Sequence, residues 1–261
     1  RALAELVDTP YVCQPGDDDF LIPKSLESCA SYLDRNSDFV AVRGRRISFS
    51  LMNDQLYSGN ISNTSLVLEA ELEQKMARDR YIAYMRNGRS IQFYVFRSEV
   101  FSTMYRHTSD AFVRYIGDEL LPCSIGVTLG KIATLDLLAT VYHVHKKHHY
   151  SWYENSFYQI LLERSTSETF RFYRRCIAEI IAKTDDTDIE SSLDLVDREL
   201  WRQIFRMLSW QYKKKYSDEN TTKIGTMRNV MAHLRKVPGI GRPISIESIY
   251  WSMREIWFSY N

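Results

Sequence analysis

Three consecutive aspartates, Asp17, Asp18 and Asp19, are the residues whose type and spacing most directly suggest chemistry. Adjacent carboxylates repel one another, and a bound cation relieves that repulsion. Hard divalent ions such as Mg²⁺ and Mn²⁺ prefer oxygen ligands and commonly bridge protein carboxylates to substrate phosphates. The triplet therefore predicts a Mg²⁺ or Mn²⁺ site. The alternative interpretation is a solvated turn that caps the following helix.

Histidines form a second group of candidate ligands. Four of the six lie in the segment HVHKKHH, at His143, His145, His148 and His149. If the segment begins as a strand, His143 and His145 share one face and can present two imidazoles to a metal ion. A zinc hydrolase built on this cluster is one interpretation, and a basic surface turn is the other.

Three arginines lie close together in a predicted strand over residues 39–50: Arg43, Arg45 and Arg46. Guanidinium groups bind phosphates through paired hydrogen bonds, so these side chains are candidates for holding the phosphates of a donor or an acceptor. We single out Arg43 as the substrate-binding candidate. An exposed basic turn is the alternative.

The composition is that of a folded globular protein and excludes several classes. With 261 residues, of which 44% are hydrophobic and 26% charged, the chain is long enough to bury a core. The 34 lysines and arginines nearly balance 33 acidic residues, which argues against a nucleic-acid partner. No run reaches the roughly 20 apolar residues of a membrane span. The four cysteines include no CxxC pair, as expected for buried, reduced thiols in the cytoplasm.

The elements that must position these residues change in character near residue 150. Before it, short β-branched and aromatic runs alternate with helical stripes, which predicts an α/β fold. After it, apolar residues recur at helical spacing, which predicts an all-helical region. The elements expected in the first part are a strand before the aspartates, a helix begun by Pro23, a strand over 39–50, a helix over 66–85, a strand over 90–101 that runs into a helix, a helix over 109–121, and one or two strands over 131–145.

A resemblance to a known family is carried by residues 9–44, which read TPYVCQPGDDDFLIPKSLESCASYLDRNSDFVAVRG. This segment resembles the metal-binding segment of family-2-like glycosyltransferases with the GT-A fold, in which a strand leads to an Asp-rich loop, a helix started by Pro and a further strand ending in Gly. The segments YVFRSEVF, GDELL and GKIATLDLLATVYHVH resemble the acceptor-side half of such enzymes, particularly the bacterial polysaccharide-type members. The resemblance covers residues 1–146.

The resemblance implies a metal site at the triplet and leaves its register open. The common family pattern is Asp, any residue, two Asp, three residues and Pro; anchored on Pro23, it selects Asp18 and Asp19 and puts a glycine where the first acid should be. The plain DxD pattern selects Asp17 and Asp19. All three aspartates are therefore candidate ligands. Many such enzymes supply a late histidine to the cation, which makes His145 the candidate extra ligand.

Asp118 and Glu119, in GDELL, stand where the family carries its acidic base motif. An inverting sugar transfer needs a carboxylate to take the proton of the acceptor hydroxyl as that oxygen attacks the anomeric carbon. The motif position favours Asp118. Glu119 stays a candidate because neighbours on a helix point about 100° apart. A pair of exposed helix acids is the alternative.

Together these features predict a GT-A-type half-domain over residues 1–150, with the metal site and the acceptor side, followed by an all-helical region over residues 151–261. The resemblance implies a metal-dependent glycosyltransferase that acts on a nucleotide-sugar donor and a glycan or lipid-linked glycan hydroxyl in surface polysaccharide synthesis. Only residues 1–10 precede the strand that follows the nucleotide-binding half in the family, so we expect the chain to be truncated at its N-terminus.

The expected location is the cytoplasm, at the inner face of the membrane. The segment QYKKKY, residues 211–216, is a candidate contact to anionic headgroups. A solvated helix end, where cations favour the helix dipole, explains it equally well. The alternative function is a non-catalytic binding or assembly module with the C-terminal helices as its interaction surface.

Overall fold

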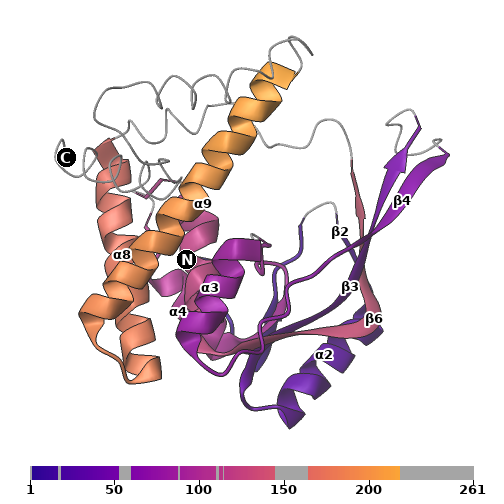
Figure 1. Cartoon of the computed structure of the whole chain (residues 1–261). Helices are drawn as coiled ribbons and strands as arrows, with labels where there is room; N and C mark the ends of the chain where they lie inside the picture. Colours follow the sequence, from indigo (N-terminus) through magenta and orange to yellow (C-terminus); the bar gives the residue numbers. More distant parts are fainter. Residues whose placement is uncertain are drawn as a thin grey trace.

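A computed structural model describes residues 2–16, 19–52, 60–87, 89–109, 112–113, 115–144 and 164–217, with only the backbone described for residues 2, 3, 164 and 210–217. Three of the predicted metal ligands, Asp17, Asp18 and His145, lie outside these ranges. The fold is mixed α/β: a curled sheet lies between one helix on one face and several helices on the other (Figure 1). The predicted α/β class is therefore confirmed.

The described residues contain one mixed sheet of six strands. Their order is β1-β5-β3-β6-β2, and β4 pairs with β3 outside this path. Strands β3 and β6 run parallel at the centre, and the other pairs are antiparallel. The strands are β1 (Tyr11–Cys13), β2 (Asp19–Leu21), β3 (Phe39–Leu51), β4 (Ile61–Val67), β5 (Val95–Arg97) and β6 (Lys131–His143).

The sheet curls where β6 gains residues relative to β3. Gly44 pairs with Leu135, whereas the next residue of β3 already pairs with Leu138. A Cβ atom on Gly44 would lie 2.5 Å from both Cδ1 and O of Leu137, closer than side chains tolerate. Glycine is therefore required at this bulge, and the bulge bends the strand.

Helix α2 (Pro23–Arg35) covers one face of the sheet. It begins with proline, whose fixed φ suits the first helical position, and it follows the predicted stripe. Cys29 and Leu33 are fully buried and pack with Val42 and Val95 of the sheet. The predicted helix after the aspartates is confirmed.

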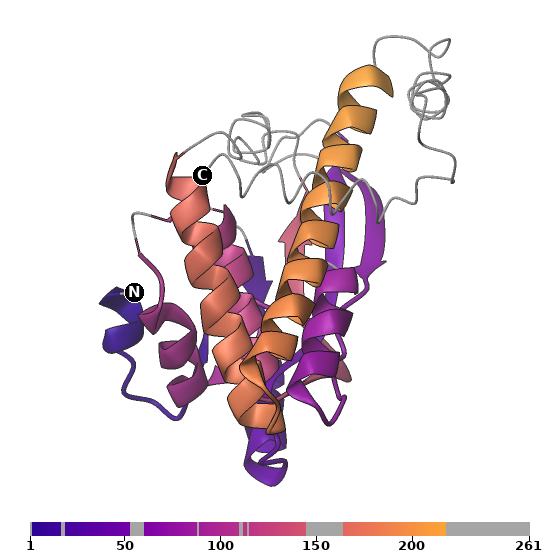
Figure 2. The same ribbon diagram turned by 60° about the vertical axis from the view of Figure 1, so that its left-hand side comes forward.

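Several helices cover the other face, and α8 and α9 lie side by side and pack against α3 and α5 (Figures 1 and 2). The short α1 lies against α4, and the π-helical turn Tyr115–Leu120 leads directly into α5. Among the helices of the described ranges, none is long and apolar enough to cross a membrane. The bounds are α1 (Ala2–Glu5), α3 (Ala77–Asn87), α4 (Ser98–Arg106), α5 (Leu121–Leu129), α8 (Arg164–Asp185) and α9 (Ile189–Ser217).

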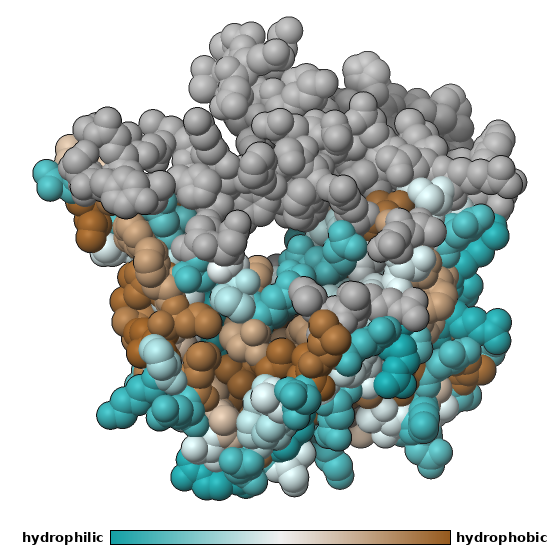
Figure 3. Space-filling model, turned by 180° about the vertical axis from the view of Figure 1, so that it is seen from behind, coloured by the Kyte–Doolittle hydropathy of each residue, from teal (hydrophilic) through white to brown (hydrophobic). Residues whose placement is uncertain are grey.

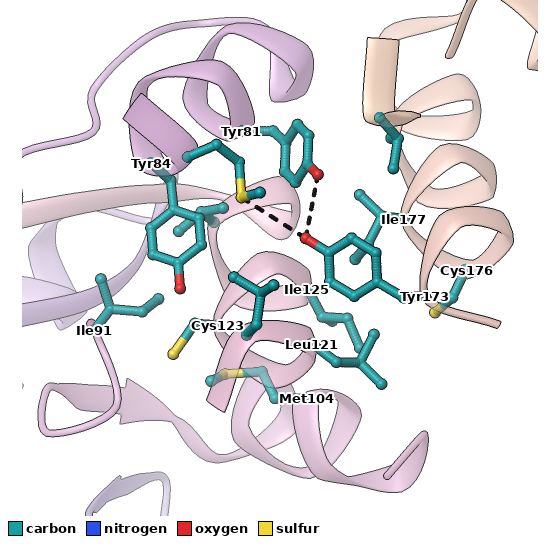
Figure 4. Close-up of a cluster of buried hydrophobic side chains, with 14 of the residues drawn as sticks. Tyr81, Tyr84, Ile91, Met104, Leu121, Cys123, Ile125, Tyr173, Cys176 and Ile177 are labelled. Carbon is teal, nitrogen blue, oxygen red and sulfur yellow. Dashed lines mark hydrogen bonds between the residues drawn. The ribbon is translucent and has the colours of Figure 1, made fainter. Parts of the chain in front are cut away.

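One hydrophobic core joins α8 to the segments that precede residue 150. Tyr173 of α8 points toward Tyr81 of α3 and lies beside Ile125 of α5 (Figure 4). Its hydroxyl is hydrogen bonded to Tyr81 Oη at 3.1 Å and to Ser124 Oγ at 2.7 Å. Burial raises the pKa of Tyr173, so the hydroxyl stays protonated and can serve both partners.

The end of the sheet beyond α2 has one apolar face. Phe20, Ile47, Leu66 and Val141 are in register across four strands and therefore share it. Phe20 is 63% exposed and Leu66 is 53% exposed. Seen from behind, apolar side chains gather on the side of the molecule that carries β3 and β4 (Figure 3). We call this the outer face and the opposite one the inner face.

Two predicted helices have the wrong bounds. Within 66–85, the helix begins only at Ala77, because residues 61–67 pair with β3 as β4. The helix expected over 109–121 is a π-helical turn that continues as α5 through Pro122 to Leu129. Proline is tolerated there because it lies in the first turn of α5.

Candidate functional site

Asp19 is the one residue of the aspartate triplet within the described ranges, and it lies at the start of β2. Its Oδ2 accepts a hydrogen bond from Gly16 N at 3.2 Å, and its own N donates to Gly16 O at 3.3 Å. Asp19 therefore stabilises a local turn, as the alternative interpretation of the triplet predicts for this residue. Its Oδ1 has no hydrogen-bond partner among the described residues, which leaves an oxygen of the kind that Mg²⁺ and Mn²⁺ prefer.

Asp19 belongs to the inner face of the sheet. It pairs with Tyr142, which in turn pairs with Ser48 of β3. Two residues along the same strands, Arg46 pairs with Thr140. Because side chains in register share a face, these polar residues line the inner face together, opposite the apolar outer face.

A chain of polar side chains links the loop before Asp19 to the predicted acid pair. Tyr105 Oη donates to Gln14 Oε1 at 3.3 Å, and Gln92 Nε2 donates to Tyr105 Oη at 3.4 Å. Gln92 Nε2 also donates to the backbone oxygen of Asp118 at 3.3 Å. β1 and β5 are antiparallel, so the residues after β1 lie beside those before β5. These contacts place Gln14, which precedes the aspartates in the chain, beside the turn that carries the acid pair.

The two acids of the π-helical turn have different surroundings. Asp118 is exposed, whereas Glu119 is half-buried. Burial raises the pKa of Glu119, and a hydrogen bond with Ser90 partly opposes that rise. A carboxyl group whose pKa is raised toward neutrality is better suited to accept a proton than an exposed one. The structure therefore turns Glu119 inward, although the motif position favoured Asp118.

The three arginines of β3 have three different environments. Arg45 pairs with Asp136, Nε to Oδ1 at 2.7 Å, at the surface. Arg46 makes a two-point pair with Glu69, with Nε–Oε1 at 2.6 Å and Nη2–Oε2 at 3.2 Å. Among the described residues, Arg43 has no carboxylate within salt-bridge distance.

Arg43 is nonetheless the most buried of the three, at 3% exposed. Its Nη2 donates to Thr140 Oγ1 at 3.1 Å, and its Cζ lies 5.8 Å from the ring centroid of Tyr94. Nε and Nη1 are buried and have no hydrogen-bond partner in the part of the chain that the structure describes. Burial, helped by the charge of Arg46, lowers the pKa of Arg43 to about 10, while Glu69, Tyr94 and, least, Asp19 act in the opposite direction. Arg43 therefore stays charged at neutral pH and senses Asp19.

The histidine cluster is only partly within the described ranges. His143 ends β6, is buried, and stacks on Phe49 with ring centroids 5.0 Å apart. His145, His148 and His149 lie outside the described residues. No three His, Cys, Asp or Glu side chains in the described parts of the chain are grouped to hold a metal ion. The metal site therefore stays a prediction that depends largely on residues outside these parts.

The cysteines fit a structural role. Cys29, Cys123 and Cys176 are buried, Cys13 is half-buried, and all four are free thiols. Burial raises the pKa of Cys29 to about 11 and that of Cys123 to about 12. Because the thiolate is the reactive form, these two side chains are inert at neutral pH.

Sequence reasoning missed the residues that connect the site. Gln14, Gln92 and Tyr105 come from three separate segments, so no local spacing marks them. Glu69, which neutralises Arg46, was missed because residues 66–85 were expected to be helical. No protein-family model matches the chain, and comparison with curated proteins finds no significant match. Function can therefore be proposed only from the residues and their arrangement.

Proposed function

We propose that this chain is part of a metal-dependent glycosyltransferase of the GT-A type, transferring a sugar from a nucleotide-sugar donor to a glycan or lipid-linked glycan hydroxyl. The proposed setting is surface polysaccharide synthesis at the cytoplasmic face of the membrane. The observation that carries the proposal is the polar connection between the loop before Asp19 and the Asp118–Glu119 turn. Sugar transfer needs a metal-binding carboxylate loop and a proton acceptor at one site, and the two segments joined by this connection carry the candidate residues for both roles.

The aspartates are the proposed metal ligands. Asp19, with Asp17 and Asp18, would hold a Mg²⁺ or Mn²⁺ ion. Such an ion offsets the negative charge that grows on a leaving diphosphate. Oδ1 of Asp19, which has no partner among the described residues, supports this role, since it is a hard oxygen ligand on the polar inner face.

Glu119 is the proposed proton acceptor for the attacking hydroxyl. Support comes from its half-buried position and from its pKa, which burial raises and a hydrogen bond with Ser90 partly lowers. Asp118 is exposed and is the second candidate. General-base catalysis contributes about 10²–10⁴-fold to a rate, which sets the expected size of the effect.

The test is turnover by the full-length protein with a panel of nucleotide sugars and Mn²⁺, measured as released nucleoside diphosphate. Glu119→Gln is expected to lower kcat about 100-fold or more, and Asp118→Asn is expected to lower it less. Glu27→Gln, an exposed acid of α2, is the matched control and should leave kcat unchanged. Removing the metal with a chelator should abolish turnover reversibly.

Two outcomes would contradict the proposal. One is the absence of turnover with every donor and added acceptor. The other is full turnover in both Glu119→Gln and Asp118→Asn, because the acid pair would then have no part in proton transfer. Full turnover in Glu119→Gln alone would move the proton acceptor to Asp118.

A further inference from the structure

The buried guanidinium of Arg43 lacks the acceptors that its charge requires. A buried ion is costly unless it is paired and hydrogen bonded. Nε carries one N–H and Nη1 carries two, so three donors have no acceptor while Nη2 alone is bonded, to Thr140. The ring of Tyr94 stabilises the cation by a cation–π contact but accepts none of these N–H groups in a hydrogen bond.

The neighbouring carboxylates of the described residues act on Arg43 only from beyond ion-pair distance. Glu69 raises the pKa of Arg43, but both of its oxygens are bonded to Arg46. Asp19 influences Arg43 electrostatically without forming an ion pair with it. Within the described residues, the inner face therefore carries one guanidinium without a counterion next to a second one that is neutralised.

We propose that Arg43 anchors a binding site for a phosphoryl group on the inner face of the sheet. A phosphoryl group offers several charged oxygens to a guanidinium, and its negative charge supplies the missing counterion. This inference rests on the proposed function only for the source of the phosphoryl group, which is either the donor diphosphate or a phosphorylated acceptor.

Arg46 is a second positive charge near Arg43. The Arg46 side chain is 19% exposed and lies over the Tyr142 ring, with Cζ 5.6 Å from the centroid. Because Nε and Nη1 of Arg43 are covered, binding requires neighbouring side chains to move until a phosphoryl oxygen can reach these atoms. Arg46 would then contribute a second positive charge.

The experiment measures phosphate binding by the full-length protein. Inorganic phosphate and pyrophosphate are titrated at constant ionic strength, with sodium chloride as the reference, and binding is read from calorimetry and from the rise in Tm. Wild type is compared with Arg43→Met and with Arg45→Met, the matched control from the same strand, whose side chain is paired with Asp136 at the surface.

Arg43→Met is expected to weaken phosphate binding about 10- to 100-fold, the usual effect of losing a charged hydrogen-bonding partner. Arg45→Met should bind phosphate as wild type does. Without phosphate, Arg43→Met should melt at the same temperature as wild type or higher, because it removes an uncompensated buried charge. A purely structural arginine would show the opposite pattern, a lower Tm and unchanged phosphate binding.

Equal phosphate binding by wild type and Arg43→Met would overturn the proposal, as would equal losses in Arg43→Met and Arg45→Met. If Arg43→Met fails to fold, Arg43→Lys replaces it, since lysine keeps the charge but lacks the planar set of donors. Phosphate affinity equal to wild type in Arg43→Lys would then overturn the proposal, and weaker affinity would support it.

Added Mn²⁺ distinguishes the two sources. Tighter binding of pyrophosphate, but not of phosphate, in the presence of Mn²⁺ assigns the site to the donor diphosphate. Binding of both probes without an effect of Mn²⁺ assigns it to a phosphorylated acceptor. Arg43-dependent phosphate binding in a protein that shows no sugar transfer would keep this site and reject the glycosyltransferase function.

Discussion

Arg43 on the inner face of the sheet and Arg80 at the junction of α3 and α5 are both 3% exposed. Arg80 uses its whole guanidinium: Nε donates to Val127 O, Nη2 to Thr128 O, and Nη1 to two carbonyl oxygens of the loop before α3, all at 2.8 Å. Arg43 makes one hydrogen bond and leaves Nε and Nη1 without acceptors. Equal burial therefore hides a large difference in hydrogen bonding.

The difference separates a structural cation from a candidate binding group. Arg80 satisfies the last carbonyls of α5, where a positive charge also favours the helix dipole, and it ties α5 to the start of α3. Arg43 makes too few hydrogen bonds to offset the cost of burying its charge, so we expect the proposed phosphoryl group to supply the missing acceptors. The number of unmade hydrogen bonds, rather than the extent of burial, thus distinguishes a candidate binding arginine from a structural one.

The largest expected effect is on Arg80. Arg80→Met removes four hydrogen bonds and leaves buried carbonyls without donors, so it should lower the free energy of unfolding by about 3 kcal/mol or more. Arg43→Met should change it far less in the absence of phosphate. Urea denaturation followed by circular dichroism measures both, and equal losses in the two variants would break the comparison.

The next largest effect is expected at Asp185, a carboxylate whose two oxygens both accept hydrogen bonds from α3. Asp185, at the end of α8, accepts from Ala77 N at 2.6 Å and Arg78 N at 2.9 Å, and so caps α3 from 107 residues away. Asp185→Ala should lower the free energy of unfolding by about 1–2 kcal/mol, as the loss of other helix caps does.

The matched control for the cap is Asp186→Asn. Asp186 is exposed and has φ 52°, a conformation that asparagine adopts readily. It should unfold at the same urea concentration as wild type. If Asp185→Ala also unfolds there, the contact between α8 and α3 contributes nothing to stability.

A smaller effect on stability is expected from Glu119, a half-buried carboxylate that a hydrogen bond with Ser90 only partly stabilises in its charged form. Burial raises its pKa, so the folded protein binds this proton more tightly than the unfolded chain does. Folding is therefore favoured most below the ordinary pKa of glutamate, and the contribution is lost as the pH rises through the raised value. Glu119→Gln should flatten this part of the pH–stability profile, measured as Tm from pH 4 to pH 8. An unchanged profile would mean that Glu119 is not desolvated.

The smallest effect is expected at Arg45. Its ion pair with Asp136 joins side chains that are 41% and 88% exposed, and exposed pairs contribute roughly 0–1 kcal/mol. Arg45→Met should change the free energy of unfolding by less than about 0.5 kcal/mol. A larger loss in urea denaturation would show that this surface ion pair stabilises the sheet bulge. Arg45 would then count as a structural arginine, as Arg80 does.

Periodicity predicted the elements whose burial is one-sided. The apolar residues of α2, including Cys29 and Leu33, recur at helical spacing within one short segment, so this helix could be predicted without knowledge of its neighbours. The strand over 39–50 and the strand after Lys131 were predicted from their β-branched, aromatic and apolar runs, which are also local. Prediction failed over 66–85 and around Pro122, where pairing with β3 and the position of the proline within a first turn decide the structure.

The sequence alone determined which chemical groups are available: three adjacent aspartates, the Asp118–Glu119 pair and three arginines within one strand. It also determined the alternation of strand and helix that brings them onto one α/β fold. Only the tertiary structure decided that Glu119 rather than Asp118 is shielded, and that Arg43 rather than Arg45 lacks a carboxylate partner. The physical reason is that solvation and ion pairing depend on distance in space, and the partners that set them lie far away in the chain.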